Sequence, residues 1–519
     1  MVMLLKKYFA ISVAHNGQHA AASGRRIPSR YQSIAVIVAA FALSRMLTAA
    51  AGVHFIIDIL HVSHFADPVL LRDHLLQTLL YLHTQPPFLN MVIGIVLKIF
   101  PDSYGTVFHL IWMAMGLFFS IVLHELMVGM GVSRWIALLL TVVFVISPAM
   151  ILYENYFFYD HFLLVGATVA AWLLYRYLSA KKIYLLVLFF SVISAIVLTR
   201  SLFHIAWMAS VIIMLLVLCR DDWRRILLAA IIPFMLALSV YVKNQVVFGS
   251  FSSSTWLGMS LARISTQQLD SNERQRMARC GEISRISLIP AFSEYDYYRN
   301  IIGKSPAAGI PVLDQVAKSS GNEPVLNFNN IDFIDISRQY ERDAKHVIAT
   351  HPGVIVKSVS LASFYYSYPA STLYYMVDSN RVNIVRYERL FDIFVYGQFY
   401  DYQHASLKSS GPDQYGVPKI FKVSLFLLIG SPLLIFYGFR LFRRGLRLGS
   451  EGRPCTITLG FILGTILWIM AIGILLEVGE NYRFRYTTEP WIFLLLGLFL
   501  SNRPWKRNAG RKGGVRDDS

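Results

Sequence analysis

Cysteines and charged residues are both scarce in this sequence. Only 15% of its 519 residues are charged, whereas 55% are hydrophobic and the mean hydropathy is +0.50. A soluble fold does not need so much apolar surface, so the composition predicts an all-α polytopic membrane protein. The three cysteines (Cys219, Cys280 and Cys455) are far apart and form no CxxC pair. Neither a disulfide framework nor a zinc knuckle is therefore indicated.

Acidic residues are the minority among the charges. There are 31 Asp and Glu against 48 Lys and Arg, which gives a formal net charge of +17. The basic residues cluster in short stretches beside apolar runs, a pattern typical of cytoplasmic loops that face anionic lipid headgroups. We therefore expect membrane lipids as partners and no nucleic acid. The sequence also has no P-loop or dinucleotide fingerprint, which argues against an ATP-driven pump.

Long apolar runs, in contrast, are abundant. They are close to the length that crosses a hydrocarbon core of about 30 Å. They cover residues 33–52, 106–123, 135–152, 157–175, 183–199, 202–219, 226–242, 420–439, 456–476 and 487–500. The pattern predicts a helical bundle of about 10–12 spans.

Basic loops near Arg176 and Arg220 and within 440–453 set the expected orientation, because such loops stay in the cytoplasm. Residues 1–32 are basic and lack a signal-peptide core, so they are expected to form a cytoplasmic tail. The predicted organisation has five parts: a cytoplasmic tail (1–32), an N-terminal transmembrane bundle (33–242) with a first outer loop (54–104), an extracytoplasmic domain (243–419), C-terminal transmembrane helices (420–501) and a second cytoplasmic tail (502–519).

Two segments need separate interpretation. The apolar run 88–100 is short for a span, so we expect an interfacial or re-entrant helix on the outer face. The alternative is that it crosses the bilayer and that 354–366 crosses as well, which keeps the later loops on their sides. Within the polar insert, a helix is predicted from Asp335 as N-cap through Ala349, ended by His351-Pro352.

The first outer loop is rich in acids and histidines. Partial desolvation at a membrane surface raises the pKa of a carboxylate toward the working pH, so an acid of this loop can serve as a general base, and Asp67 is the candidate. The alternative is structural, because Asp67 before Pro68 also fits an N-cap followed by proline at the first helical position. His61 and His64 are spaced to share a helical face, so a divalent metal site competes with ordinary interfacial histidines.

Two more acids, Glu154 and Asp160, lie at the expected outer edge of the membrane. Acids in this position are costly unless they are paired or line a polar cavity, so a catalytic role is one interpretation. The other is a helix-start acid that interacts with the macrodipole. The stretch 249–258 is rich in glycine and serine and favours a tight loop over a ligand, although this signal is not specific.

Several basic residues are expected on the outer face, where charge bias does not place them. They are Arg200 with His204 one turn on, Lys243, and the group Tyr482, Arg483 and Arg485. Planar guanidinium groups on this side suggest that an anion is held, and phosphate is the natural candidate. The alternative is that these arginines snorkel or neutralise Glu480 and Glu489.

Four features together resemble the GT-C superfamily of membrane glycosyltransferases. They are the acidic first outer loop, the stretch from His83 through Gln85-Pro86-Pro87 with a helix after it, Ser147-Pro148 followed by an outer-edge acid, and many spans with an outer soluble part. Within the superfamily, the bacterial protein-mannosyltransferase-like and aminoarabinose-transferase-like (family 39 type) members are the most similar.

The resemblance implies a function. Such enzymes transfer a sugar from a polyprenyl-phosphate carrier to a glycan, lipid or protein acceptor on the outer face of the bacterial inner membrane. It implies Asp67 as the catalytic acid of the first loop and Glu154 or Asp160 as the second. His83 and Gln85 would then join the basic residues in binding the donor. Two departures are that Pro68 replaces the usual acid after Asp67, and that Gln85 stands where lysine is common.

Other function classes fit parts of the pattern. A lipid-linked glycan ligase or polymerase would use a similar donor. A transporter or flippase of lipid-linked sugars would show repeated halves and charged or broken helices near mid-bilayer, whereas here the acids lie at the ends of the predicted spans. A non-catalytic assembly scaffold would tolerate replacement of Asp67.

Overall fold

The computed structural model describes residues 28–61, 64–303, 305–319, 325–373, 380–398, 423–447 and 452–501. Within these ranges the chain is all-helical, with two isolated β-bridges and no strand. The predicted tails lie outside the described residues except for the last five residues of 1–32, and so does the end of the insert from residue 399.

Six helical segments of the described chain are long and apolar enough to cross a membrane. They are α2 (Arg30–Ala50), α6 (Tyr104–Gly129), α9 (Tyr159–Ala180), η3 with α12 (Arg220–Phe248), η12 with α20 (Phe426–Gly445) and α21 (Arg453–Leu475). The number is up to eight if each of two bent pairs is counted as one span: α7 (Arg134–Val145) with α8 (Pro148–Glu154), and α17 (Asp332–Thr350) with α18 (Gly353–Tyr366). The chain is an integral, multi-pass membrane protein.

The span count is lower than predicted because three of the predicted runs form shorter helices. These are α10 (Ile183–Val197), α11 (Ile205–Leu218) and α23 (Glu489–Ser501), with 15, 14 and 13 residues. At 1.5 Å per residue they reach about 20 Å, less than the roughly 30 Å of a hydrocarbon core.

Local sequence signals explain several helix ends. Ser29 forms a capping box with Gln32 at the start of α2. Ser147 caps α8 through the N–H of Met150, and Pro148 occupies the first helical position. Because a residue before proline avoids the helical conformation, α7 cannot continue straight into α8, and the two meet at 55°.

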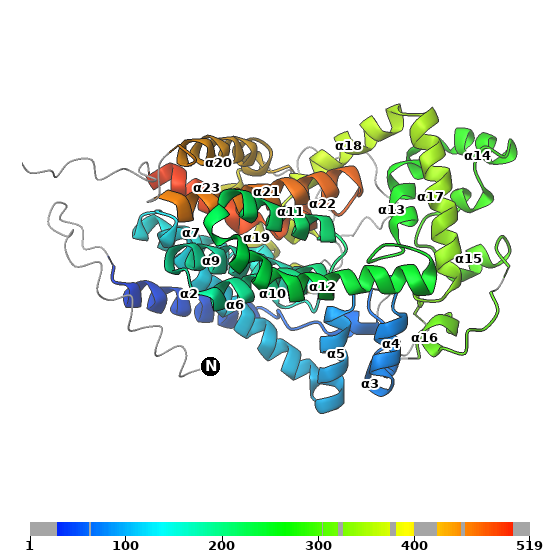
Figure 1. The fold of residues 1–519 in the computed structure, drawn as a ribbon, viewed down its shortest axis with the longest axis horizontal. Coiled ribbons are helices and arrows are strands. Elements are labelled where there is room, and N and C mark those ends of the chain that lie inside the picture. The colour runs from blue at the N-terminus through cyan, green and yellow to red at the C-terminus, as the bar shows by residue number, and fades with distance from the viewer. Residues whose placement is uncertain are drawn as a thin grey trace, which may run out of the picture.

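The bundle helices run along the long axis of the molecule, and a lobe of helices α13–α17 lies beyond one end (Figure 1). The long helix α12 extends from the bundle toward this lobe. Helices α3 (Pro68–Asp73), α4 (Leu75–Tyr81) and α5 (Phe88–Ile99) lie crosswise to α12 near the junction. Helix α5 has 12 residues, so at 1.5 Å per residue it is about 18 Å long, and whether it is interfacial stays a prediction.

The lobe has its own apolar core. It contains α13 (Leu257–Ile264), α14 (Ser271–Arg279), α15 (Tyr295–Arg299), α16 (Pro311–Asp314) and α17. Met259 of α13 packs with Phe333 and Tyr340 of α17. Gly258 makes this contact close, because an added Cβ would lie 1.8 Å from the Ser337 carbonyl oxygen. By contrast, α18 and α19 (Val382–Tyr396) contribute to the core of the bundle.

Two predicted boundaries are wrong. Helix α17 begins at Asp332 and not after Asp335, because the side chain of Asn330 already accepts a hydrogen bond from the Asp332 N–H (3.1 Å). It ends at Thr350, before His351-Pro352, as predicted. Helix α12 continues past residue 242 to Phe248, where Gly249 ends it with φ 65°.

Candidate functional site

A cavity of about 770 Å³ lies where the bundle meets the lobe. Its walls come from the turn between α10 and α11, the serine-rich stretch before α13, the loop before α15, and the end of α21 with α22 (Asn481–Tyr486). The volume falls in the range of about 300–1,000 Å³ that is typical of small-molecule sites. The serine-rich stretch therefore lies over a cavity, as the interpretation of residues 249–258 requires.

One wall of the cavity carries two arginines that share a carboxylate. Arg200 Nη1 lies 3.0 Å from Asp160 Oδ1, and Arg483 Nε lies 3.7 Å from Asp160 Oδ2. Arg483 Nη1 also pairs with Glu480 Oε2 at 2.9 Å. Both arginines line the cavity, although Arg483 is only 2% exposed. Asp160, Arg200 and Arg483 are 40 to more than 300 residues apart in the chain, and the fold brings them into contact.

Aromatic rings hold these guanidinium groups in place. The Arg200 Cζ lies 4.4 Å from the ring centroids of both Tyr159 and Phe484. Arg483 donates a hydrogen bond to the Tyr159 hydroxyl (3.1 Å). Planar groups held in this way are preorganised to present fixed N–H donors to a planar or tetrahedral anion.

A fourth ion pair lines the same cavity. Arg263 Nη1 lies 2.8 Å from Glu477 Oε1, and Arg263 Nη2 donates to the Val478 carbonyl (2.9 Å). Burial raises the pKa of Glu477, and the charge of Arg263 opposes that rise. The positive charges of Arg200, Arg263 and Arg483 are therefore balanced by the carboxylates of Asp160, Glu477 and Glu480. Asp160 is counted here because it pairs with two of the arginines, although it does not itself line the cavity.

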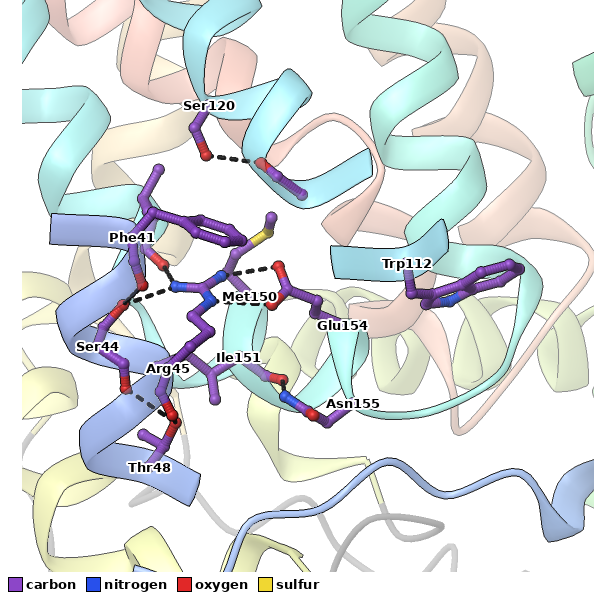
Figure 2. Close-up of polar contacts among 12 residues, drawn as sticks. Phe41, Ser44, Arg45, Thr48, Trp112, Ser120, Met150, Ile151, Glu154 and Asn155 are labelled. Carbon is purple, nitrogen blue, oxygen red and sulfur yellow. Dashed lines mark hydrogen bonds and ion pairs between the residues drawn. The ribbon is translucent and has the colours of Figure 1, made fainter. Parts of the chain in front are cut away.

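Glu154 belongs to a different cluster. Its two carboxylate oxygens accept hydrogen bonds from Nε and Nη2 of Arg45, both at 2.9 Å, and Arg45 also donates to the Val145 carbonyl (2.7 Å). Figure 2 shows this pair enclosed by α2, α6 and α8, with Phe41 against the guanidinium group. Glu154 is fully buried and does not line the cavity.

The Arg45–Glu154 pair depends on a glycine. A Cβ added at Gly116 would lie 2.0 Å from Glu154 Oε2, and the bidentate pair cannot move away without losing hydrogen bonds. We expect Gly116→Ala to destabilise the protein by about 1–3 kcal/mol, seen as a lower apparent Tm in detergent. The matched control is Gly464→Ala, also inside a helix, where no atom lies within 4 Å of the added Cβ. Equal Tm values for the two variants would contradict this explanation.

Asp67 is the N-cap of α3. Its Oδ1 accepts a hydrogen bond from the Val69 N–H (2.9 Å), and its Oδ2 accepts one from the Ser319 N–H (2.5 Å). The side chain is 1% exposed and does not line the cavity, whereas His64, three residues earlier, does. In this conformation both oxygens of Asp67 act structurally.

Beside Asp67 lies a buried lysine. Burial lowers the pKa of Lys318 to about 7, and the charge of Asp67 opposes the shift. In the unfolded chain lysine titrates near about 10.4, so between about pH 7 and 10 unfolding takes up a proton. Stability should therefore rise as the pH increases through this window, and Lys318→Met should remove that rise. The apparent Tm measured as a function of pH tests this dependence. The control is Lys345→Met, which replaces an exposed lysine. If the apparent Tm of Lys318→Met rises with pH as steeply as that of the wild type, Lys318 is not the cause of the rise.

The stretch from His83 to Gln85 links the bundle to the lobe. His83 Nδ1 lies 2.7 Å from Thr255 Oγ1 and its Nε2 3.0 Å from the Asn329 carbonyl oxygen. Burial lowers the pKa of His83 to about 4, so its ring is neutral at working pH. Gln85 lines the cavity, but His83 does not.

Of the remaining predicted binding residues, one lines the cavity and three do not. His204 lines the cavity and caps α11, accepting a hydrogen bond from the Ala206 N–H (3.1 Å). Lys243 donates to the Leu82 carbonyl (2.5 Å), and Tyr482 stacks on Tyr368, outside the cavity lining. Arg485 pairs with Glu489 (3.2 Å) and donates to the Tyr366 carbonyl, so it neutralises a buried acid.

The proposed metal site has no clear set of ligands. In the part of the chain that the structure describes, no three or more His, Cys, Asp or Glu residues lie close enough to hold a metal ion. Burial, helped by the nearby Arg483 charge, lowers the pKa of His64 to about 3. His64 packs edge-on against Phe158 and Trp256, at centroid distances of 5.2 and 5.7 Å.

Among the cavity residues that the sequence did not predict are Arg263, Glu477, Phe292 and Phe328. A signal for Glu477 was present, because Glu477, Glu480 and Arg483 follow one another at steps of three residues. No comparable signal marks Arg263, which lies in an ordinary amphipathic helix of the lobe.

No protein-family model matches the sequence, and no curated protein matches it at a significant level.

Proposed function

We propose that this protein is a glycosyltransferase that moves a sugar from a polyprenyl-phosphate carrier to an acceptor hydroxyl. The observation that carries the proposal is the pair Arg200 and Arg483, fixed by aromatic rings in a cavity at the end of a membrane bundle. Preorganised guanidinium groups in a water-poor site stabilise the negative charge that develops on a departing phosphate.

The membrane side of the cavity suits a lipid carrier. Leu202, Trp468 and Ile472 line it, and the last two belong to α21. A prenyl chain can thus approach from the bilayer while its phosphate reaches Arg200. A GT-C-like fold, a cavity on the extracytoplasmic face and location in a bacterial inner membrane are parts of the same proposal. The orientation predicted from the basic loops supports the extracytoplasmic position of the cavity.

The reaction needs a general base, and we assign Glu477 to that role. The acceptor oxygen attacks the anomeric carbon, its proton goes to Glu477, and the bond from that carbon to the phosphate oxygen breaks with its electrons on the phosphate. Direct attack predicts inversion at the anomeric carbon. Before the reaction, the arginine and carboxylate charges around the cavity balance. When Glu477 takes up the proton, these side chains are left with one net positive charge, which offsets the second negative charge that the phosphate gains.

Glu477 is preferred to the acids that the resemblance implies. It lines the cavity, and burial raises its pKa toward neutrality. Glu477 is itself paired with Arg263, but Asp67 and Glu154 are bonded to backbone N–H groups and to Arg45, respectively, at places that do not line the cavity. Asp160 neutralises Arg200 and Arg483 and so orients the phosphate-binding groups.

Reconstitution tests the proposal. Purified protein in liposomes would be given radiolabelled prenyl-phosphoryl sugars and a panel of glycan, lipid and peptide acceptors. We expect labelled acceptor and free prenyl phosphate in equal amounts with at least one donor. Failure of every donor, with folded protein shown by its Tm, would reject a transferase.

A further inference from the structure

The cavity has a second wall, contributed by the lobe, that the phosphate-binding groups do not explain. Trp256, Phe292 and Phe328 all line it. Their rings meet edge to face, with centroids 5.3 Å apart for Trp256–Phe292, 5.4 Å for Trp256–Phe328 and 5.9 Å for Phe292–Phe328. Such a trio forms an apolar aromatic surface on the cavity wall.

The backbone of Phe292 is unusual. Its φ is 66°, in the left-handed region that a bulky residue rarely adopts. Strain of this kind persists where surrounding structure imposes it, and it concentrates at ligand sites. The loop is held nearby by Ser293, whose hydroxyl donates to the Pro290 carbonyl (2.7 Å). The fold thus accepts backbone strain to keep an aromatic ring at the cavity wall.

Most of the polar side chains on this wall carry hydroxyls. Ser253, Ser254, Ser260 and Ser293 line the cavity beside the aromatic rings. Among the residues that the structure describes, Arg263 is the only charged one that the lobe contributes to the lining, and it is paired with Glu477. A ligand portion that rests here is met by ring faces, ring edges and neutral hydrogen-bonding groups.

The two walls are joined through His64. Its ring meets those of Trp256 and Tyr159 edge to face, at centroid distances of 5.7 and 6.4 Å. Tyr159 in turn accepts a hydrogen bond from Arg483. A single ligand in the cavity can therefore touch the arginine wall and the aromatic wall at once.

We propose that the wall of Trp256, Phe292 and Phe328 binds the transferred sugar and selects an uncharged, hydroxyl-rich pyranose. The C–H groups of one pyranose face pack on aromatic rings, while its hydroxyls exchange hydrogen bonds with serines. A uronic acid or an amino sugar would bring a charge to a wall whose one charged side chain among the described lining residues, Arg263, is already paired with Glu477. This inference rests on the proposed function and adds the substrate class.

Binding of short donor analogues tests it without turnover. The probes are farnesyl-phosphoryl-glucose and farnesyl methyl phosphate, two diesters with the same charge that differ in the sugar. We expect the glucosyl probe to bind wild-type protein about 10-fold more tightly. The variants Trp256→Ala and Phe292→Gly should reduce that preference to about 1, while the affinity for the methyl diester stays the same.

Phe292→Gly is informative because glycine adopts φ 66° without strain, so the ring is lost without a demand on the backbone. The matched control is Phe394→Ala, which removes an 82%-exposed ring of α19 and should keep the preference. A preference that survives in both wall variants would overturn the inference, as would equal binding of a farnesyl-phosphoryl-glucuronate probe. If neither diester binds wild-type protein, the proposed function fails as well; if both bind equally, only the sugar subsite fails.

Discussion

Replacing Arg200 with lysine is expected to lower sugar transfer by about 10²-fold, the cost of losing one preorganised donor to a developing anion. Lysine keeps the positive charge beside Asp160 but loses the planar fork and the sandwich between Tyr159 and Phe484. The fold should survive because no charge is left unpaired. Initial rates with a radiolabelled prenyl-phosphoryl sugar measure the effect.

The chain supplies a matched control in Arg45→Lys. Arg45 also forms a buried pair with a carboxylate, Glu154, but this pair does not line the cavity. We expect Arg45→Lys to lower the stability of the protein and to leave the rate of sugar transfer per folded molecule unchanged. If both variants lose transfer equally, the cavity arginines have no special role in binding phosphate.

The second large effect is expected for Glu477→Gln. Loss of a general base should lower turnover by roughly 10²–10⁴-fold. Since the base must be deprotonated, wild-type turnover should fall as the pH drops through the pKa of Glu477, which burial raises above the usual value of about 4.3. Glutamine cannot titrate, so the residual rate should lack this acidic limb.

Asp67→Asn distinguishes the base from the N-cap. Asparagine caps helices as well as aspartate, so α3 is retained, although its NH₂ group faces the Ser319 N–H less favourably. We expect turnover within about tenfold of wild type and an unchanged pH profile. Loss of turnover in Asp67→Asn with retention in Glu477→Gln would return the base to Asp67, as the family resemblance implies.

Hydropathy predicted most of the membrane helices, because burial in lipid requires continuous apolar segments. Helices α2, α6, α9 and α21 lie within a few residues of their predicted limits. The lengths of α10 and α11 were not predictable, since apolar loop residues such as Leu202 and Phe203 extend the hydropathic pattern beyond the helix. An apolar side chain buried at a turn gives the same signal as one in a span.

For the site, the residue types were easier to predict than their partners. Arg200 and Arg483 were singled out because they violate the charge bias, and the structure brings them together at Asp160. Glu154 has the same sequence character as Asp160 but pairs with Arg45 in the first helix. The choice between the two acids is made by tertiary packing, which sequence spacing does not encode. The aromatic wall likewise depends on a lobe fold whose contacts are non-local.

The most direct measurement is a structure of the protein with farnesyl-phosphoryl-glucose bound. The phosphate is predicted within about 3 Å of guanidinium nitrogens of both Arg200 and Arg483, with the prenyl chain toward α21. A phosphate bound elsewhere, while both arginines contact only their protein carboxylates, would contradict the central claim that this cavity binds a lipid-linked sugar phosphate.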